Sequence, residues 1–359
     1  MKWIGLVWAA TFFANDGAAQ PSYRNEWIDH SKVYYKIRVA EQRLYRIQKS
    51  VLTTAGLGDV PAQHFQLWSQ GKEIPLYTTQ SMGTLANNGF IEFYGKPLDG
   101  EADTELFPDP TQHVNKRISY FSDTAFYFLT VNADGPNLRF TAAPNLVNTT
   151  TLPPDSFYMH TYAADYYRGN FSFNYNLGFA NLVGGEPVRS SVWDQGEGFA
   201  SSPFNVRDVL NFRVQNLRAF RNGPTMRLRH SVVGVSTANK WVTLGLNDSV
   251  VNKVDITGFN QVMAEVQNIP YSRIDVSDGI TFNYRTDDAG YHLTVPQSTS
   301  LELTYARRFI FDNSRIAEFP LAANTNGNHL RLAAFATDGQ APVLFDLSQL
   351  RRYEGVLKA

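Results

Sequence analysis

Acidic residues alternate in one loop of the sequence, at Asp99, Glu101 and Asp103. Carboxylate oxygens are preferred ligands of Ca²⁺, and calcium-binding loops place them at alternate positions. The three residues are therefore candidate calcium ligands. The loop lacks the twelve-residue EF-hand pattern, and a solvated turn is the alternative interpretation. Two other acidic stretches, residues 275–279 and 287–290, are typical of turns first and are candidate cation sites second.

Other common catalytic patterns are absent from the sequence. The chain has no cysteine, which excludes a cysteine nucleophile, a thiolate metal site and disulfides. Its seven histidines are not spaced as metal ligands, and His-Glu-x-x-His does not occur. Gly234-Val235-Ser236 lacks the second glycine of a nucleophile elbow. A glycosidase would need two carboxylates facing each other across a cleft, which a sequence does not establish. We therefore predict no enzyme activity, and no cofactor apart from the candidate calcium.

The composition favours a β-protein that does not bind nucleic acid. Aromatic residues make up 14% of the chain, and they suit the half-buried surfaces of sheets. The formal net charge is −1, and no run of Lys and Arg exceeds two residues. A nucleic-acid interface would need a concentrated basic patch, so we expect none.

The N-terminus is typical of a secretory signal. An apolar run over residues 3–14 follows one lysine and precedes small residues. Such a run is shorter than the roughly 20 residues that span a bilayer. We predict a signal peptide over residues 1–19, cleaved between Ala19 and Gln20. No later segment predicts a membrane span, so we expect an exported protein in the periplasm, on the outer membrane surface or outside the cell.

Short alternating segments in the first part of the chain must position the acidic loop. Residues 34–39 and 44–47 alternate as strands and predict a hairpin. Residues 50–57 predict one short helix, which ends at glycines. A second hairpin is expected where 65–68 and 74–77 flank Gln70-Gly71-Lys72.

The rest of the chain predicts a second β domain. Residues 155–205 are dense in Tyr and Phe without a regular period, and we interpret residues 151–205 as an aromatic connector, with a ligand platform as the alternative. Strands then recur about every ten residues, typical of a β-sandwich. The prediction is all-β, with two sandwich-like domains at 20–150 and 206–359. Because no closing element follows the last strand, we expect the chain to stop before a further domain.

Several short segments follow one another in a distinctive order over the first 200 residues. They are Asn25-Glu26-Trp27-Ile28-Asp29, Tyr34-Tyr35-Lys36, Leu44-Tyr45-Arg46-Ile47, Phe65-Gln66-Leu67-Trp68, Ile91-Glu92-Phe93-Tyr94-Gly95, Asp99-Gly100 with Asp103, Asp123-Thr124-Ala125, Tyr127-Phe128-Leu129-Thr130-Val131 and Gly196-Glu197-Gly198. In order and spacing they resemble the region before the catalytic domain in gingipain-like proteins of the type IX secretion system sortase family.

The resemblance implies an exported, bacterial (Bacteroidetes-like), cell-surface accessory protein. In that family, such β domains precede a caspase-like peptidase domain with a His–Cys dyad, which removes C-terminal targeting domains from cargo. Because this chain has no cysteine, no catalytic residue carries over, although a longer parent protein could be a cysteine peptidase. The implied partner is that peptidase domain or its cargo. The alternative function is a carbohydrate-binding β-sandwich protein of the cell surface.

Overall fold

The computed structural model describes most of the chain after the predicted signal peptide. The described residues are 25–146, 152–164, 170–172, 182–183, 186–187, 193, 195–236, 238–287 and 295–357. Ala19 and Gln20 lie outside them. The regular structure of the described residues is nearly all β-sheet, mostly antiparallel, which confirms the all-β prediction. No helix in this part is long and apolar enough to span a membrane.

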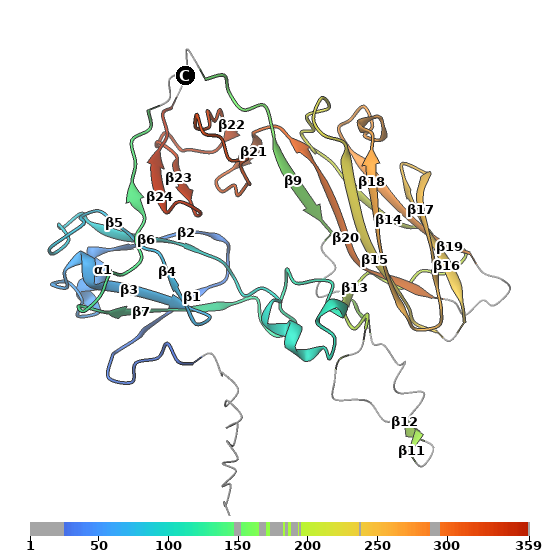
Figure 1. The fold of residues 1–359 in the computed structure, drawn as a ribbon, viewed down its shortest axis with the longest axis horizontal. Helices are drawn as coiled ribbons and strands as arrows, with labels where there is room; N and C mark the ends of the chain where they lie inside the picture. The colour runs from blue at the N-terminus through green and yellow to red at the C-terminus, as the bar shows by residue number, and fades with distance from the viewer. Residues whose placement is uncertain are drawn as a thin grey trace, which may run out of the picture.

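The first body is a sandwich of two small sheets, drawn in blue and teal in Figure 1. One sheet has the order β1 (Tyr35–Val39), β7 (Ala125–Val131), β3 (Phe65–Ser69) and β4 (Lys72–Ile74). The other has the order β2 (Arg43–Gln48), β6 (Phe90–Gly95) and β5 (Tyr77–Thr78). The predicted short helix is α1 (Lys49–Thr54), and a 3₁₀ turn, η1 (Ala62–His64), precedes β3. Phe65, Leu67, Ile91, Phe93 and Leu129 belong to the core of this body.

Only one of the two hairpins predicted in this body forms. Strands β3 and β4 pair as expected, and Gln70 and Gly71 have φ of 49° and 74°, as a type I′ turn requires. The hairpin of 34–39 with 44–47 was a wrong prediction. Strand β1 pairs with β7, and β2 pairs with β6 in the other sheet. A sandwich core needs apolar faces on both sides, and placing these strands in opposite sheets supplies one to each.

The second body is a larger sandwich, drawn in yellow and orange in Figure 1. One sheet has the order β14 (Leu210–Val214), β19 (Ile280–Asp287), β16 (Lys240–Leu246) and β17 (Ser249–Ile256). The other has the order β18 (Gln261–Ile269), β15 (Met226–Gly234), β20 (Pro296–Arg307) and β9 (Tyr158–Ala163). The 3₁₀ turn η4 (Tyr271–Arg273) follows β18. A turn at Asn247-Asp248 joins β16 and β17, with φ of 48° and 63°.

The range 151–205, expected to be irregular, is partly regular. Its residues 158–163 form β9, which pairs with β20 at the edge of the second body. The remaining described pieces are short pairs. They are β10 (Asn170–Ser172) with β13 (Gly198–Ala200), and β11 (Leu182–Val183) with β12 (Glu186–Pro187). Tyr166, Tyr167, Phe173, Tyr175 and Phe179 lie outside the described residues.

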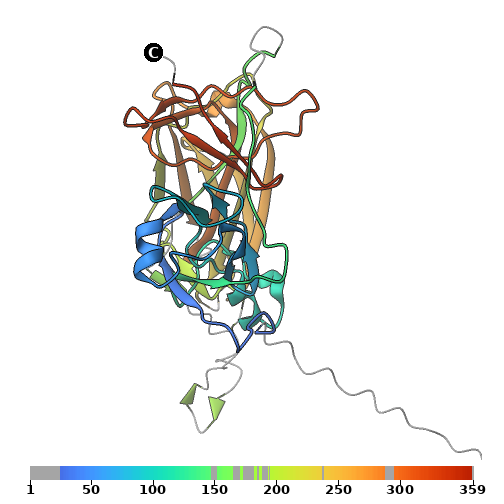
Figure 2. The ribbon, with the colours of Figure 1, turned by 90° about the vertical axis from the view of Figure 1, so that its left-hand side faces the viewer.

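The C-terminal segment, residues 308–357, lies against both bodies. Its strands β21 (Ile310–Ser314) and β22 (Ala333–Phe335) pair in parallel. Strands β23 (Val343–Asp346) and β24 (Arg351–Glu354) form a sheet with β8 (Thr141–Ala142), which follows the first body. In Figures 1 and 2 these red strands lie above the first body, and in Figure 1 β21 and β22 lie toward β9. The 3₁₀ turns η2 (Ala102–Leu106) and η3 (Pro110–Gln112) lie between β6 and β7.

Candidate functional site

The three candidate calcium ligands take separate structural roles. Asp103 is 6% exposed, and its carboxylate accepts the backbone N–H of Tyr120 at 2.7 Å and the hydroxyl of Ser119 at 3.3 Å. Asp99 accepts the backbone N–H of Glu101 at 3.2 Å. Within the described ranges, no group of three or more His, Asp or Glu side chains is arranged to hold a metal ion. The calcium site stays a prediction.

The anchoring of Tyr120 by Asp103 builds an aromatic cluster between the two bodies. The ring of Tyr120 lies 4.6 Å from that of Trp193 and 5.2 Å from that of Phe199. Phe107 stacks on His113 at 5.0 Å and meets Trp193 edge-on at 5.6 Å. We call these five rings the aromatic junction. It joins the loop between β6 and β7 to Trp193 and to Phe199, which lies in β13 beside β20.

Burial and close packing fix the aromatic junction. The His113 imidazole is 3% exposed, and burial lowers its pKa below the ordinary value of histidine. Its Nδ1 lies 2.9 Å from the hydroxyl of Thr104, whereas Nε2 is buried without a partner in the described structure. Gly198 has a φ of 137°, and a Cβ there would collide with the Tyr120 ring. Glycine is therefore required for the close approach of the two segments.

A buried ionic cluster attaches the C-terminal segment to the first body. Glu92 points outward from β6, opposite the core, and is 3% exposed. Its two oxygens accept Arg46 Nη2 at 2.6 Å and Arg352 Nε at 3.1 Å. Arg352, 5% exposed, lies with its guanidinium carbon 4.3 Å from the centre of the Tyr77 ring. A buried charge needs such a partner, so Glu92 and Arg352 depend on each other.

Glu318 makes a second polar contact between the C-terminal segment and the first body. Its carboxylate accepts the Tyr94 hydroxyl at 2.7 Å, the Lys96 ammonium at 3.2 Å and the side-chain amide of Gln42. Burial, together with this carboxylate, raises the pKa of Tyr94 above its ordinary value. Tyr94 lies on the same face of β6 as Glu92, so the C-terminal segment covers the outer face of this sheet.

Aromatic packing holds the other side of the C-terminal segment on the second body. The ring of Tyr158, in β9, lies 5.1 Å from Phe309, 5.3 Å from Phe319 and 6.3 Å from Phe311. Arg218, which follows β14, donates its Nε to Asp312 in β21 at 2.8 Å. The C-terminal segment is thus anchored on both bodies.

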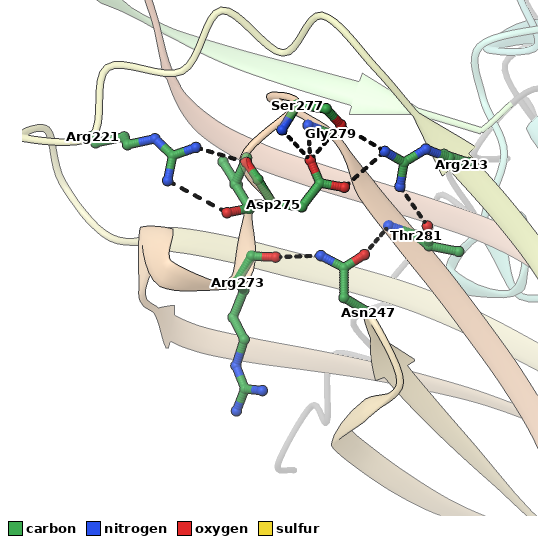
Figure 3. Close-up of polar contacts among 9 residues, drawn as sticks. Arg213, Arg221, Asn247, Arg273, Asp275, Ser277, Gly279 and Thr281 are labelled. Atoms are coloured by element: carbon green, nitrogen blue, oxygen red, sulfur yellow. Dashed lines mark hydrogen bonds and ion pairs between the residues drawn. The ribbon is translucent and has the colours of Figure 1, made fainter.

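A polar network beside this anchor fixes the loop between β18 and β19 (Figure 3). Asp275 accepts the backbone N–H groups of Ser277 and Gly279, at 2.9 and 3.0 Å, and Arg213 Nη2 at 2.7 Å. The Ser277 hydroxyl also donates to Asp275, at 2.7 Å, and this bond and the one from Arg213 are the main causes that lower the pKa of Asp275. Arg221 donates to the carbonyl of Asp275 at 3.0 Å. The acidic turn predicted at 275–279 therefore has its carboxylate occupied by turn contacts.

Lys240 is buried without a carboxylate in the part of the chain that the structure describes. It is 2% exposed, and its ammonium donates to the Ser236 hydroxyl at 3.1 Å and to the carbonyls of Ser236 and Gly258 at 3.3 and 3.1 Å. Burial lowers the pKa of Lys240 to about 8. The contacts tie together two turns of the second body, and they occupy Ser236, the serine of the Gly234-Val235-Ser236 pattern.

Aromatic side chains also gather on the outer face of the sheet β1–β7–β3–β4. The rings of Trp27 and Trp68 are stacked at 5.4 Å, and Phe128 lies 5.5 Å from Trp27. Phe126 is 41% exposed, with the Lys36 ammonium 3.6 Å from its ring centre. Exposed rings on a flat sheet could stack on a sugar. Here Trp27 covers Trp68 and Lys36 covers part of Phe126, which reduces the ring area open to a ligand.

Sequence reasoning found the acidic loop but missed the residues that join the parts of the chain. Glu92 carried one signal, because it stands inside the apolar strand Phe90-Ile91-Glu92-Phe93. Its neighbours on the same face, Phe90 and Tyr94, are aromatic, and a glutamate that becomes buried among such rings is almost always paired. Its partner Arg352 lies 260 positions away, and no local pattern connects the two.

Comparisons with known proteins give distant structural similarities only. No family model matches the chain, and no curated protein matches it. The dimeric latent PorU from Porphyromonas gingivalis is 11% identical, with a TM-score of 0.46 over 80% of this chain and 25% of that one. The chain therefore spans about a quarter of that protein's length.

Two further structures are less similar. The CBM36-1 domain of a xylanase from the hindgut metagenome of Trinervitermes trinervoides is 11% identical, with a TM-score of 0.22 over 30% of this chain and 77% of that one. The ANX2 ectodomain from Arabidopsis thaliana is 11% identical, with a TM-score of 0.23 over 77% of this chain and 81% of that one. Scores this low carry no functional conclusion.

Proposed function

We propose that this chain is an exported, non-catalytic scaffold that positions a peptidase domain or its cargo. The observation that carries the proposal is the double anchoring of the C-terminal segment. Glu92 and Glu318 contacts attach it to the first body, while Tyr158 and Arg218 attach it to the second. Together with the aromatic junction, these contacts hold two sandwiches in one orientation. Fixed orientation is the property that a positioning protein needs.

The contacts made by four charged side chains support a scaffold rather than an enzyme. Glu92, Asp103, Asp275 and Lys240 all have their polar atoms engaged in contacts within the chain. A catalytic group instead needs a free position next to substrate. The sequence resemblance to the region before the catalytic domain of gingipain-like type IX secretion sortases supplies the class of partner.

The rigidity of the scaffold can be measured directly, because a chain without cysteine accepts spin labels at chosen sites. Labels on cysteines introduced at Val51 and Val250, 57% and 61% exposed, report the distance between the two bodies. We expect one narrow distance distribution, as narrow as that of a control pair within the second body, Val250 with Val276. A broad distribution for the first pair alone would refute a fixed orientation.

The partner is tested with the mature chain purified from an exporting bacterium. We expect no hydrolysis of a broad peptide panel, and co-purification of a caspase-like peptidase domain or of exported cargo with a C-terminal targeting domain. A chain that hydrolyses peptides, or that carries neither partner, would contradict the proposal.

Carbohydrate binding is the second candidate, favoured by the exposed Phe126 on the same sheet face as Phe128, which contacts Trp27. Xylotriose bound on this face would change the tryptophan fluorescence. Phe121→Ala, which removes another exposed phenylalanine ring, is the control. A saturable fluorescence change that is lost in Phe126→Ala and kept in Phe121→Ala would establish carbohydrate binding. We expect xylotriose to cause no fluorescence change.

A further inference from the structure

A pocket of about 450 Å³ opens where the C-terminal segment meets the first body. Its lining consists of Tyr77, Ala142, Ala143, Pro144, Asn145, Arg352 and Glu354. The volume falls within the usual range for small-ligand sites. Arg352 and Tyr77 come from the ionic cluster, so the packing that attaches the segment also forms this wall of the pocket.

Arg352 is a buried cation with donor capacity left over. Its Nε is occupied by Glu92 at 3.1 Å, and one Nη1 bond goes to Glu354 at 2.9 Å. Its Nη2 donates no hydrogen bond to any residue that the structure describes. A guanidinium carries five N–H donors in a planar fork that matches a carboxylate. The stacked Tyr77 ring, 4.3 Å away, holds the plane of this fork in place.

Glu354 differs from Glu92 in its exposure. The side chain of Glu92 is 5% exposed, whereas that of Glu354 is 68% exposed, at the rim of the pocket. Because only the Glu354 side of this pair is exposed, water solvates its carboxylate once it leaves Nη1, and a ligand carboxylate in its place keeps the buried Arg352 paired. Asn145 holds the backbone at this rim, because its side-chain amide donates to the carbonyl of Glu354 at 2.9 Å.

We propose that this pocket binds a ligand carboxylate on Arg352, with the ligand displacing the side chain of Glu354. The ligand oxygens take the Nη1 and Nη2 donors, while Glu92 keeps Nε and the buried charge balance. The carboxylate can belong to the C-terminus of a peptide or to an acidic sugar, and both offer the same planar group. The site is independent of the scaffold function, which rests on the attachment of the segment and not on the pocket.

Glu354→Gln provides the test, since it removes the competing carboxylate and leaves the buried pair intact. Binding of N-acetyl-Ala-Ala with a free carboxylate, and of galacturonate, is measured by calorimetry with the mature chain. At least one should bind about fivefold tighter to Glu354→Gln than to the wild type, the ratio expected when one exposed ion pair stops competing. Glu41→Gln is the matched control, because Glu41 has a 67% exposed side chain paired with Arg43 and does not line this pocket. The Glu41→Gln variant should bind both ligands with the affinity of the wild type.

Neutral analogues identify the group that is bound. The C-terminal amide of the same peptide, and galactose, should bind to neither protein. Arg352→Lys, with folding checked by its thermal transition, should abolish binding of the acids. The peptide acid binding alone, or galacturonate binding alone, supports the site and identifies the source of the carboxylate. Equal binding of acid and neutral forms, or no gain in Glu354→Gln, would overturn the proposal.

Discussion

Replacing Glu92 with Gln should release the C-terminal segment from the first body. The change leaves the Arg352 guanidinium, 5% exposed, without its buried carboxylate. Breaking a buried ion pair by removing one partner costs about 3–5 kcal/mol. Because Glu354 and the Tyr77 ring still contact Arg352, we expect the low end of that range, about 3 kcal/mol.

Urea denaturation and limited proteolysis measure this effect. Glu92→Gln should lower the free energy of unfolding and expose residues 333–357 to protease at urea concentrations where both sandwiches remain folded. Glu265→Gln is the matched control, since Glu265 also lies between two arginines, Arg227 at 3.9 Å and Arg229 at 3.7 Å, but on the surface. We expect it to cost less than about 0.5 kcal/mol.

The double variant Glu92→Met with Arg352→Met separates charge burial from general loss of packing. It removes both buried charges and keeps similar volume, so most of the lost stability should return. A double variant as unstable as the sum of the two single variants, or a Glu92→Gln variant within about 1 kcal/mol of the wild type, would refute the reasoning.

Three further predictions follow from other parts of the chain. Burial lowers the pKa of His230 to about 4, so the unfolded state binds more protons below pH 6.5. The contribution of His230 to the free energy of unfolding should therefore be fully present at neutral pH and be lost, by about 3 kcal/mol, between pH 6.5 and 4. Urea titrations at several pH values measure this loss, and His230→Gln should make it smaller. Gly198→Ala should cost about 1–3 kcal/mol and shift tryptophan emission, whereas Gly327→Ala, also at positive φ but in open space, should not shift it. N-terminal sequencing of exported material should begin at Gln20, and a mature protein that retains Trp3 would contradict this.

Local sequence patterns predicted those features that depend on a few adjacent residues, such as tight turns. The turn at Gln70 and Gly71 fixes its hairpin because few residues adopt positive φ, and Asn247-Asp248 does the same in the second body. The partner of β1 was not predictable in this way. Its alternation shows that one face is buried, but whether β2 or β7 lies alongside depends on residues nearly 90 positions apart, such as Arg38 and Phe126.

The junctions were harder to predict because they depend on residues with no special local pattern. Tyr120 and Trp193 belong to segments with little regular structure, and the contacts that bring them together include the buried carboxylate of Asp103 and the backbone bond from Trp193 to Leu106. The sequence marked Asp103 as a candidate calcium ligand. In the structure its two oxygens accept groups of Ser119 and Tyr120. A carboxylate in a loop can bind a cation or accept hydrogen bonds from the chain. Which of the two it does depends on residues whose positions in space the sequence does not give.

The order of contacts along the chain has a consequence for how the parts assemble. The core of the first body uses residues 39–129, so that body can form from its own segment. Until the C-terminal segment arrives, its outer face presents Glu92 paired only with Arg46, whose side chain is 45% exposed. Water then solvates the free oxygen, and no buried charge is left unpaired. Docking of Arg352 removes that water and fixes the second sandwich at the same time, since the same segment carries Phe309 and Phe311. Rigid coupling of the two bodies therefore depends on this buried ion pair, together with the Glu318 contacts and the aromatic junction.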